Sequence, residues 1–456
     1  MLNAMSSLHS KWNKQAMLVR AVLLPTLTVL CAMSSSAQGF ESDSLLASYV
    51  AESWKAHPNI ERMQAMIAVE RSRATMNNSW MNPELRAGLM NVPENFDVHA
   101  DPMTMFQIGA MQQIPFPGKL KAARRAGEAR VNAATATLDQ ERFRMAAMVA
   151  MAYYDLAAAL ETRQTLEQGL VLTKQAVDAA TSLLSTGKGS QTEVLRAGLE
   201  QEEWNLKLLA NASETDQKRA ALAYAIGRTE VSTLTDPVLP SSLPPMIDLD
   251  AGLALAENAS TPQVRIAQAQ SRATEFELRR AKLEYWPDIK LELAYGIRGA
   301  LNGTGADPHT GEPISQSIKQ DNMVTIEMSA PVPLFSRGNQ RARIQEARAM
   351  NRDRQSEQRE SVLNLQQELR IAHAEFTETI NQYEVNRRVV QQAEAAWRSA
   401  LVDYQAGMYP YMGLSEARMI LVMAQIESVM YRAKAWATYQ QWQSLLGNYT
   451  VDATEQ

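Results

Sequence analysis

The sequence predicts a mainly α-helical chain with a small transmembrane β part, organised as two structural repeats. Each repeat is expected to contain a long helical hairpin and two β-strands. Three observations support this prediction: landmarks that recur at a nearly constant offset, long stretches without helix-breaking residues, and short segments in which apolar and polar residues alternate. The composition agrees with it, since Ala, Gln, Glu, Arg, Leu and Met dominate and aromatic residues make up only 6%.

The repeats are visible as landmarks that return in the same order, about 220 residues later. Ile114-Pro115-Phe116 returns as Val332-Pro333-Leu334, and Ile226-Gly227 returns as Leu446-Gly447. The segment between the repeats is rich in proline, which favours an extended connector. We therefore expect a first repeat at residues 38–227, a linker at 228–247, a second repeat at 248–447 and a C-terminal tail at 448–456.

Each repeat contains an unusually long helical stretch. No Gly or Pro intervenes between Gly338 and Gly407, and the stretch from Gly118 to Gly187 is interrupted only by Gly127 and Gly169. Such a helix would be a rod about 100 Å long, whereas a mean helix has about 11 residues. We expect each rod to turn and return as a helical hairpin, at residues 118–227 and 337–447. An ordinary coiled coil is the alternative interpretation, but it does not explain the strand pairs.

Four segments alternate between apolar and polar residues and are predicted as strands, at about 83–91, 103–114, 288–298 and 322–334. In the third, Leu291 and Leu293 alternate with Glu292, which indicates a sheet with one apolar and one polar face. Each segment has the length that a tilted transmembrane strand needs, although a soluble sandwich would alternate in the same way.

The number of strands predicts an oligomer if the strands meet lipid. Two hairpins cannot close a barrel, and open sheet edges are not tolerated in a bilayer. Single-chain membrane barrels begin at about eight strands, so several copies must combine their strands. Three copies would form a barrel of about 12 strands.

The first residues read as an export signal. Basic residues precede an apolar run at 21–33, and Ser35 and Ala37 fit the small-x-small rule, so we expect a signal peptide at residues 1–37. An amino-terminal membrane anchor is the alternative. Cys31, the only cysteine, follows Leu30, whereas a lipidated cysteine would follow a small residue. Beyond residue 37 we expect no membrane-spanning helix.

Several chemistries are not expected. The 45 Lys and Arg residues are nearly balanced by 50 Asp and Glu residues without a basic patch, which argues against nucleic acid as a partner. The histidines beyond the signal segment, His57, His99, His309 and His373, are scattered singly, so we predict no metal-binding site and no cofactor. Tyr153-Tyr154-Asp155 suits a helix surface better than a catalytic dyad, and we predict no enzyme activity. Methionines could bind soft ions such as Cu(I), but core packing is the favoured interpretation. They occur at Met145, Met148, Met151, Met408, Met412, Met419, Met423 and Met430.

Over essentially the whole mature chain, the repeats, rods and hairpins resemble the outer-membrane efflux protein (TolC) family. Within it, Asn82-Pro83-Glu84-Leu85 together with the segment Gln112 to Leu120 resembles the branch that serves heavy-metal efflux pumps. The resemblance implies a homotrimer, with a 12-strand β-barrel in contact with outer-membrane lipid and an α-helical tunnel across the periplasm.

The resemblance also implies a passive duct that works with a periplasmic adaptor protein and an inner-membrane efflux pump. Heavy-metal cations are the expected cargo. Two alternatives stay open. One is a duct for organic drugs or for type I protein secretion, and the other is a periplasmic coiled-coil scaffold without a pore.

In the family, the tips of the helical hairpins contact the adaptor and close the tunnel. The corresponding candidates here are Gly187, Lys188, Gly407, Met408 and Tyr409.

Just beyond the tips, Glu193 and Glu416 are candidates for acidic rings at the tunnel mouth, where three copies would favour cations. Solvated helix faces are the competing interpretation. Gly413 and Arg196 occupy the repeat-equivalent places of these two acids, so the two tips are not interchangeable.

Overall fold

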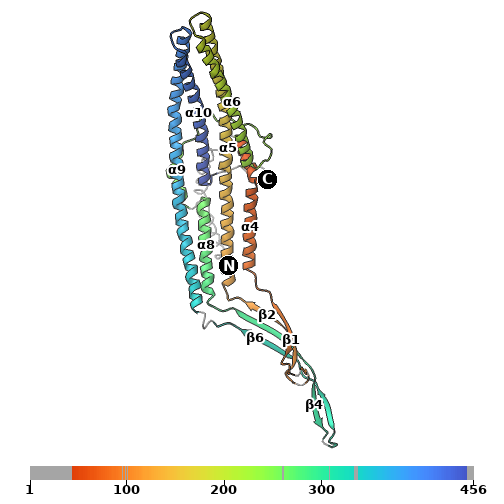
Figure 1. Ribbon diagram of the computed structural model, residues 1–456. Coiled ribbons are helices and arrows are strands. Elements are labelled where there is room, and N and C mark those ends of the chain that lie inside the picture. The colour runs from red at the N-terminus through yellow and green to blue at the C-terminus, as the bar shows by residue number, and fades with distance from the viewer. Residues whose placement is uncertain are drawn as a thin grey trace, which may run out of the picture. The chain divides into compact units, whose positions relative to one another are not determined.

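The computed structural model describes residues 44–94, 96–97, 99, 101–258, 261–307, 309–332 and 337–448 (Figure 1). The predicted signal peptide, Cys31 and residues 449–456 of the predicted tail lie outside the described residues. The helices are α3 (Ser44–Ala56), α4 (Pro58–Asn77), α5 (Lys119–Ser185), α6 (Gln191–Ile226), α7 (Leu249–Glu257), α8 (Pro262–Leu283), α9 (Arg337–Gln405) and α10 (Tyr411–Leu446). The strands are β1 (Glu84–Met90), β2 (Met105–Ile114), β3 (Ile289–Arg298), β4 (Leu301–Ala306), β5 (Pro313–Ile318) and β6 (Met323–Ser329).

The chain divides into two compact units that do not coincide with the two sequence repeats. The first unit contains the described residues up to Ile60, Glu141–Leu249 and the residues from Leu369 onward. The second contains Glu61–Gln140 and Asp250–Glu368. Each unit therefore takes segments from both repeats.

The two long helices are present within the predicted ranges. Helix α5 has 67 residues and α9 has 69, so each is about 100 Å long. The shorter helices break near prolines, as the sequence indicates, with Pro58 starting α4 and Pro262 at the first turn of α8. Proline fits there because the first helical N–H groups have no partner within the helix.

The core of the first unit is formed by α5, α6, α9 and α10, and small side chains allow these helices to approach closely. Ala176, Ala180 and Ala197 are almost completely buried in it, beside the larger Trp397 and Tyr404. A buried asparagine also joins the two helices of each hairpin. Asn211 of α6 donates to the backbone oxygen of Ala159 at 3.2 Å, and Asn386 of α9 donates to that of Ala424 at 2.8 Å. These bonds satisfy amide N–H groups that would be costly to bury alone, whereas Asn211 Oδ1 has no partner among the described residues.

Helix α5 departs from one expectation. Among the described residues it is the one helix with an 18-residue window apolar enough for a membrane span, with a mean hydropathy of 1.2. Half of this window is buried, as in the core helix of a water-soluble domain. Its alanines and methionines raise the hydropathy, and Met145 and Ala146 pack completely inside the unit.

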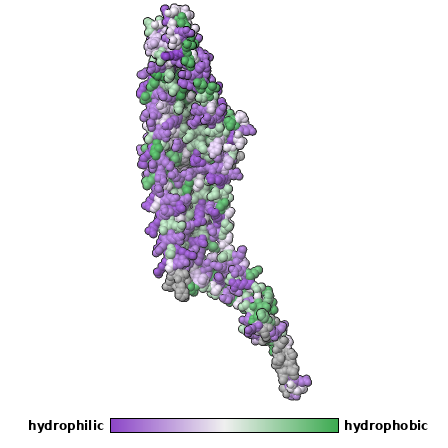
Figure 2. Space-filling view, in the orientation of Figure 1, coloured by the Kyte–Doolittle hydropathy of each residue, from purple (hydrophilic) through white to green (hydrophobic). Residues whose placement is uncertain are grey.

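The second unit contains an antiparallel sheet with the strand order β1-β2-β3-β6. Its register aligns apolar residues from all four strands on one face, because Leu89 pairs with Phe106, Phe106 with Ile297, and Leu293 with Ile326. Two methionines of β2, Met105 and Met111, lie on the opposite face and are buried. The apolar face is exposed, and Leu85 and Ile326 have 82% and 73% of their surface accessible. Figure 2 shows the hydrophobic side chains over the strands. The predicted two-faced sheet is confirmed.

The number of strands was predicted wrongly. The sequence indicates four strands, whereas the described residues contain six, because β4 and β5 form a separate two-stranded sheet. Residues 301–318 are rich in Gly, Ser and Thr and lack the alternation of a sheet with one apolar face, so they read as a loop. Of the predicted strand at 322–334, the part at 323–329 is a strand among the described residues, and residues 333 and 334 lie outside them. Strand β6 ends at Ser329, two residues before Pro331, which has no N–H for the ladder.

The two stretches that carry the branch-level resemblance lie near one corner, where the sheet meets α5. The carboxylate of Asp288 accepts hydrogen bonds from Lys119 Nζ at 2.6 Å, from the Phe116 N–H at 2.9 Å and from Gln113 at 3.1 Å. The Phe116 ring stacks on Trp286, with centroids 5.4 Å apart. The segment Gln112 to Leu120 therefore has a local structural role at this corner.

Candidate functional site

The candidate site is the pair of turns that joins α5 to α6 and α9 to α10, at the upper end of Figure 1. Both turns follow a helix that ends in the same way. The N–H of Lys188 bonds to the oxygen of Leu183, and the N–H of Met408 bonds to that of Asp403, both at 2.9 Å. This is the Schellman arrangement, which satisfies the last carbonyl groups of a helix.

Gly187 and Gly407 are the residues that permit these turns. Their φ angles are +73° and +75°, in the left-handed region that glycine adopts without steric cost. Lys188, Met408 and Tyr409 are exposed beside them, and 76% of the Met408 surface is accessible. The five predicted contact residues thus lie on two turns of one unit, and what they contact remains a prediction.

Glu193 lies in the first turn of α6, where the Ser190 side chain caps the helix by accepting from the N–H of Glu193 at 3.3 Å. Its side chain is half-buried and faces Tyr404 of α9. Burial, and then the nearby charge of Glu193, raise the pKa of Tyr404 to about 12, because both disfavour a phenolate. Glu193 is therefore part of the contact between the two hairpins rather than only a solvated helix face.

Glu416 has a different environment, since it is exposed on α10 and forms no ion pair within the described residues. Among the described residues, no hydrogen bond and no shared partner joins Glu416 to Glu193. At Gly413, the repeat-equivalent place of Glu193, the Tyr409 ring occupies the space that a Cβ would need. This ring explains why α10 has no acid there.

A third acid, Glu200, was not recognised from the sequence. Its carboxylate accepts hydrogen bonds from Tyr411 at 2.8 Å, from Ser415 at 2.7 Å and from the guanidinium of Arg418. The three donors lie on one face of α10, at i, i+4 and i+7, whereas Glu200 belongs to α6. Arg418 has only 1% of its surface exposed. The helical spacing of Tyr411, Ser415 and Arg418 is visible in the sequence, but it does not identify Glu200 as their shared acceptor.

The Arg418 guanidinium is only partly satisfied in one chain. Its Nε and Nη1 have no hydrogen-bond partner among the described residues, and its carbon lies 6.0 Å from the Trp204 ring centroid. Burial, and then the hydrogen bond to Glu200, raise the pKa of Tyr411. The cluster is a directional polar contact inside an otherwise apolar interface between the hairpins.

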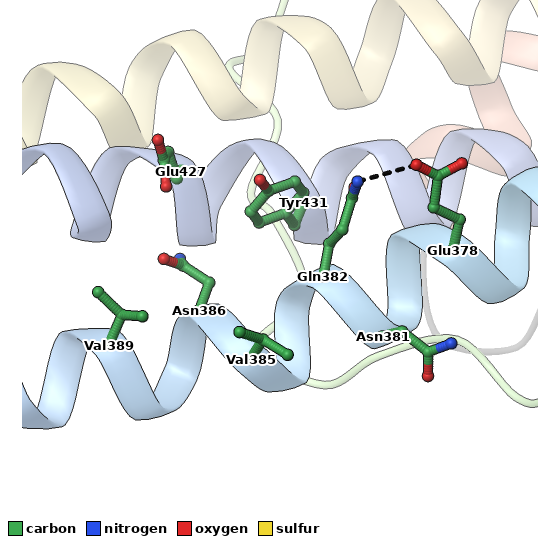
Figure 3. Close-up of a pocket in the computed structure, with 8 residues that line it drawn as sticks. All are labelled: Glu378, Asn381, Gln382, Val385, Asn386, Val389, Glu427 and Tyr431. Carbon is green, nitrogen blue, oxygen red and sulfur yellow. Dashed lines mark hydrogen bonds between the residues drawn. The ribbon is translucent and has the colours of Figure 1, made fainter.

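Two grooves run along the helices of the same unit. The first, of about 630 Å³, lies between α9 and α10 and is lined by Val385, Val389, Tyr431 and polar residues that include Glu378 and Glu427 (Figure 3). The second has about 560 Å³ and includes Met151 of α5 and Met430 of α10. Lys218 binds Asp155 at 2.7 Å and Lys434 binds Glu375 at 3.2 Å along its wall. Among the described residues, no His, Asp and Glu side chains form a cluster of three that could hold a metal ion.

The fold is that of solved outer-membrane channels. The outer-membrane channel OprN is 17% identical, over 91% of this chain and 94% of that chain, with a TM-score of 0.72. The outer membrane protein VceC from Vibrio cholerae is 18% identical, over 89% of this chain and 96% of that chain, with a TM-score of 0.72. CusC is 16% identical, over 90% and 94% of the two chains, with the same TM-score. At these identities the likeness establishes the fold.

Residues 49–228 and 253–448 match the outer membrane efflux protein family. The chain belongs to this family, whose members are outer-membrane efflux channels rather than enzymes. The family-level resemblance is thereby confirmed, whereas the heavy-metal branch is not distinguished, since CusC is no more similar than OprN or VceC. No curated protein sequence matches this chain significantly.

Proposed function

We propose that this chain is the outer-membrane channel subunit of a tripartite efflux system, a passive duct that works with a periplasmic adaptor and an inner-membrane pump. The observation that carries the proposal is the β1-β2-β3-β6 sheet, which exposes a continuous apolar face. In water, the exposure of such a face would cost about 25 cal/mol of free energy for each Å² of apolar surface. In a bilayer the same face is solvated by lipid.

The edges of this sheet support an oligomer. Strands β1 and β6 are the outer strands, and each has one side without a partner strand among the described residues. Unpaired N–H and C=O groups cost several kcal/mol each in lipid, so the edges must pair with other copies. Pairing β6 of one copy with β1 of the next, around three copies, gives a closed barrel of about 12 strands. The helical hairpins would then extend into the periplasm.

The two helical turns are the proposed end of the tunnel. Lys188, Met408 and Tyr409 offer one cation and two large apolar groups to an adaptor, beside the turns at Gly187 and Gly407. Three-fold symmetry would repeat Glu193 and Glu416 as rings of carboxylates. Glu416 is the better candidate for a ring that meets permeating ions, because it is exposed and Glu193 faces Tyr404.

We propose heavy-metal cations as the cargo, and one row of carboxylates on the polar face of the sheet supports a cationic solute. Glu84, Met111, Glu292 and Glu327 are directly paired in one row across the four strands. Arg86 lies 3.4 Å from Glu292 and 3.6 Å from Glu84, so Glu327 is the acid farthest from this positive charge along the row. Inside a barrel, this row would face the lumen and offer carboxylates to cations, while Arg86, Lys290 and Arg298 lie on the same face in other rows.

The cargo can be tested by growth of the source bacterium with and without this gene, on salts of copper, silver, zinc, cobalt and nickel and on detergents and dyes. The expected result is loss of tolerance to one or more of the metals, restored by the wild-type gene. A useful control is a variant with Ile326→Arg on the apolar face, which should not restore tolerance. Sensitivity to organic compounds alone would contradict the metal cargo and favour a duct for organic drugs.

A further inference from the structure

The exposed methionines of α10 do not fill the core of the chain. All four methionines of this helix, Met412, Met419, Met423 and Met430, are between 45% and 59% exposed. Their spacings of seven, four and seven residues place them within about 40° of one another around the helix, at about 100° per residue. The buried positions of α10 are occupied by other residues, among them Leu414, Leu421 and Val429. The packing interpretation is therefore wrong for these four side chains within one chain.

The repeat-equivalent helix α6 provides an internal comparison. It also exposes an apolar line, formed by Leu195, Leu199, Leu206 and Leu209, but it contains no methionine. An outward face that needs only apolar area for contact with another helix can therefore use leucine in this protein. Exposed methionines also occur on α4, α5 and α9, but α10 differs in carrying four of them on one face, which places several sulfur atoms along one line.

Thioether sulfur is a soft ligand that selects ions such as Cu(I) and Ag(I). We propose that Met419, Met423 and Met430 form a line of thioether sites for a soft monovalent cation along the outward face of α10. Met419 and Met423 are one turn apart, with Cβ atoms about 5–6 Å from each other, so their flexible side chains can reach one ion. Met430 lines the groove of about 560 Å³ together with Met151, which brings a second sulfur from α5.

Two neighbouring contacts define the limits of this line. The sulfur of Met412 accepts a hydrogen bond from the Arg196 guanidinium, and a positive charge at that place disfavours a bound cation. In the groove, Asp155 and Glu375 are paired with Lys218 and Lys434. Glu214 also lines this groove and forms no ion pair among the described residues, so it can add charge attraction for any cation, whereas the sulfur atoms select a soft one.

The test uses the purified full chain in detergent with methionine methyl groups labelled with ¹³C, titrated with Ag(I) in a chloride-free buffer. The methyl signals of Met419, Met423 and Met430 are expected to shift. The triple variant Met419→Leu, Met423→Leu, Met430→Leu should lose at least about tenfold in affinity for Ag(I). Met412→Leu is the matched control, because it removes a sulfur of the same helix face that is already engaged. Leucine has nearly the same volume, so folding and assembly should be retained.

Unshifted methyl signals, or equal Ag(I) binding by the triple variant and the wild type, would overturn the assignment. Zn(II) is the second probe, and an equal response to Zn(II) would also contradict selective binding by thioethers. The inference rests on the proposed metal cargo for its biological role, but the two can fail separately. Ag(I) binding by the methionines with no effect of gene deletion on metal tolerance would contradict the cargo alone.

Discussion

The buried guanidinium of Arg418 on α10 donates to the carboxylate of Glu200 on α6, and this ion pair joins the two helical hairpins near their turns. Tyr411 and Ser415 bond to the same carboxylate, so one acid receives three donors from one helix face. The surrounding contacts are apolar and tolerate sliding of one helix along the other, whereas the three hydrogen bonds of this cluster can form in only one alignment of α6 and α10. We interpret it as the contact that fixes the alignment of the hairpins.

Replacing one member of this pair should therefore be costly. Arg418→Met leaves the half-buried Glu200 carboxylate without its charged partner, and we expect a loss of about 3 kcal/mol in the free energy of unfolding, the lower end of the range for buried pairs. The double variant with Glu200→Met should regain part of this loss, since it removes the unpaired charge. Denaturant unfolding followed by circular dichroism measures the free energy of unfolding of the single and the double variant. Arg398→Ala, at the exposed pair of Arg398 and Glu394, is the control and should change stability little.

Tyr404 should make stability sensitive to alkaline pH. Its pKa is raised from 10.0 to about 12 in the folded chain, so between these values the folded state retains a proton that the unfolded state has lost. The contribution of the Tyr404 proton to the free energy of unfolding is constant below pH 10.0 and is lost as pH rises towards about 12. Tyr404→Phe removes this titration, so the free energy of unfolding of the wild type should fall relative to that of the variant over that range. A constant difference across it would contradict the assignment.

The left-handed turn at Gly407 predicts a specific cost for a side chain. Gly407→Ala places a Cβ at a φ of +75° and should cost about 1 kcal/mol, seen as a lower melting temperature. Gly338→Ala is the matched control, since Gly338 lies in α9 without a positive φ, and an added methyl group would meet open space there. The control should be neutral or slightly stabilising. Equal effects at both glycines would show that the turn does not require glycine.

The two faces of β6 should respond differently to charge. Ile326→Arg places a cation on the apolar face and should cost about 2–4 kcal/mol in the membrane, reducing the protein recovered in the outer-membrane fraction. Thr325→Arg carries the same side chain on the opposite face and should be recovered like the wild type. Fractionation and immunoblotting compare the two. If Thr325→Arg were lost and Ile326→Arg retained, the proposed orientation of the sheet would be reversed.

The long elements could be predicted because their signals are local. The absence of Gly and Pro between Gly338 and Gly407 predicts the rod of α9, and the glycine after it predicts its end. Alternation in Asp288 to Ile297 predicts β3, because the two faces of a strand meet different surroundings. These signals are read within one element and need no knowledge of its neighbours.

The parts that sequence analysis missed depend on contacts between distant segments. The cluster at Glu200 requires α6 and α10 to lie side by side, and no local pattern connects Glu200 with Arg418. Strands β4 and β5 pair with each other, and their sequences lack a regular alternation of apolar and polar residues, so periodicity does not reveal them. Glu193 and Glu416 look alike in the sequence, but the ring of Tyr404 lies beside only the first of them.

The central claim, that this chain forms a membrane channel, is tested most directly by electrical recording. Purified protein added to a planar lipid bilayer should assemble as a trimer and produce stepwise increases in current, and Ile326→Arg should abolish them. A monomeric preparation that does not insert into lipid and carries no current would contradict the channel and favour the periplasmic scaffold.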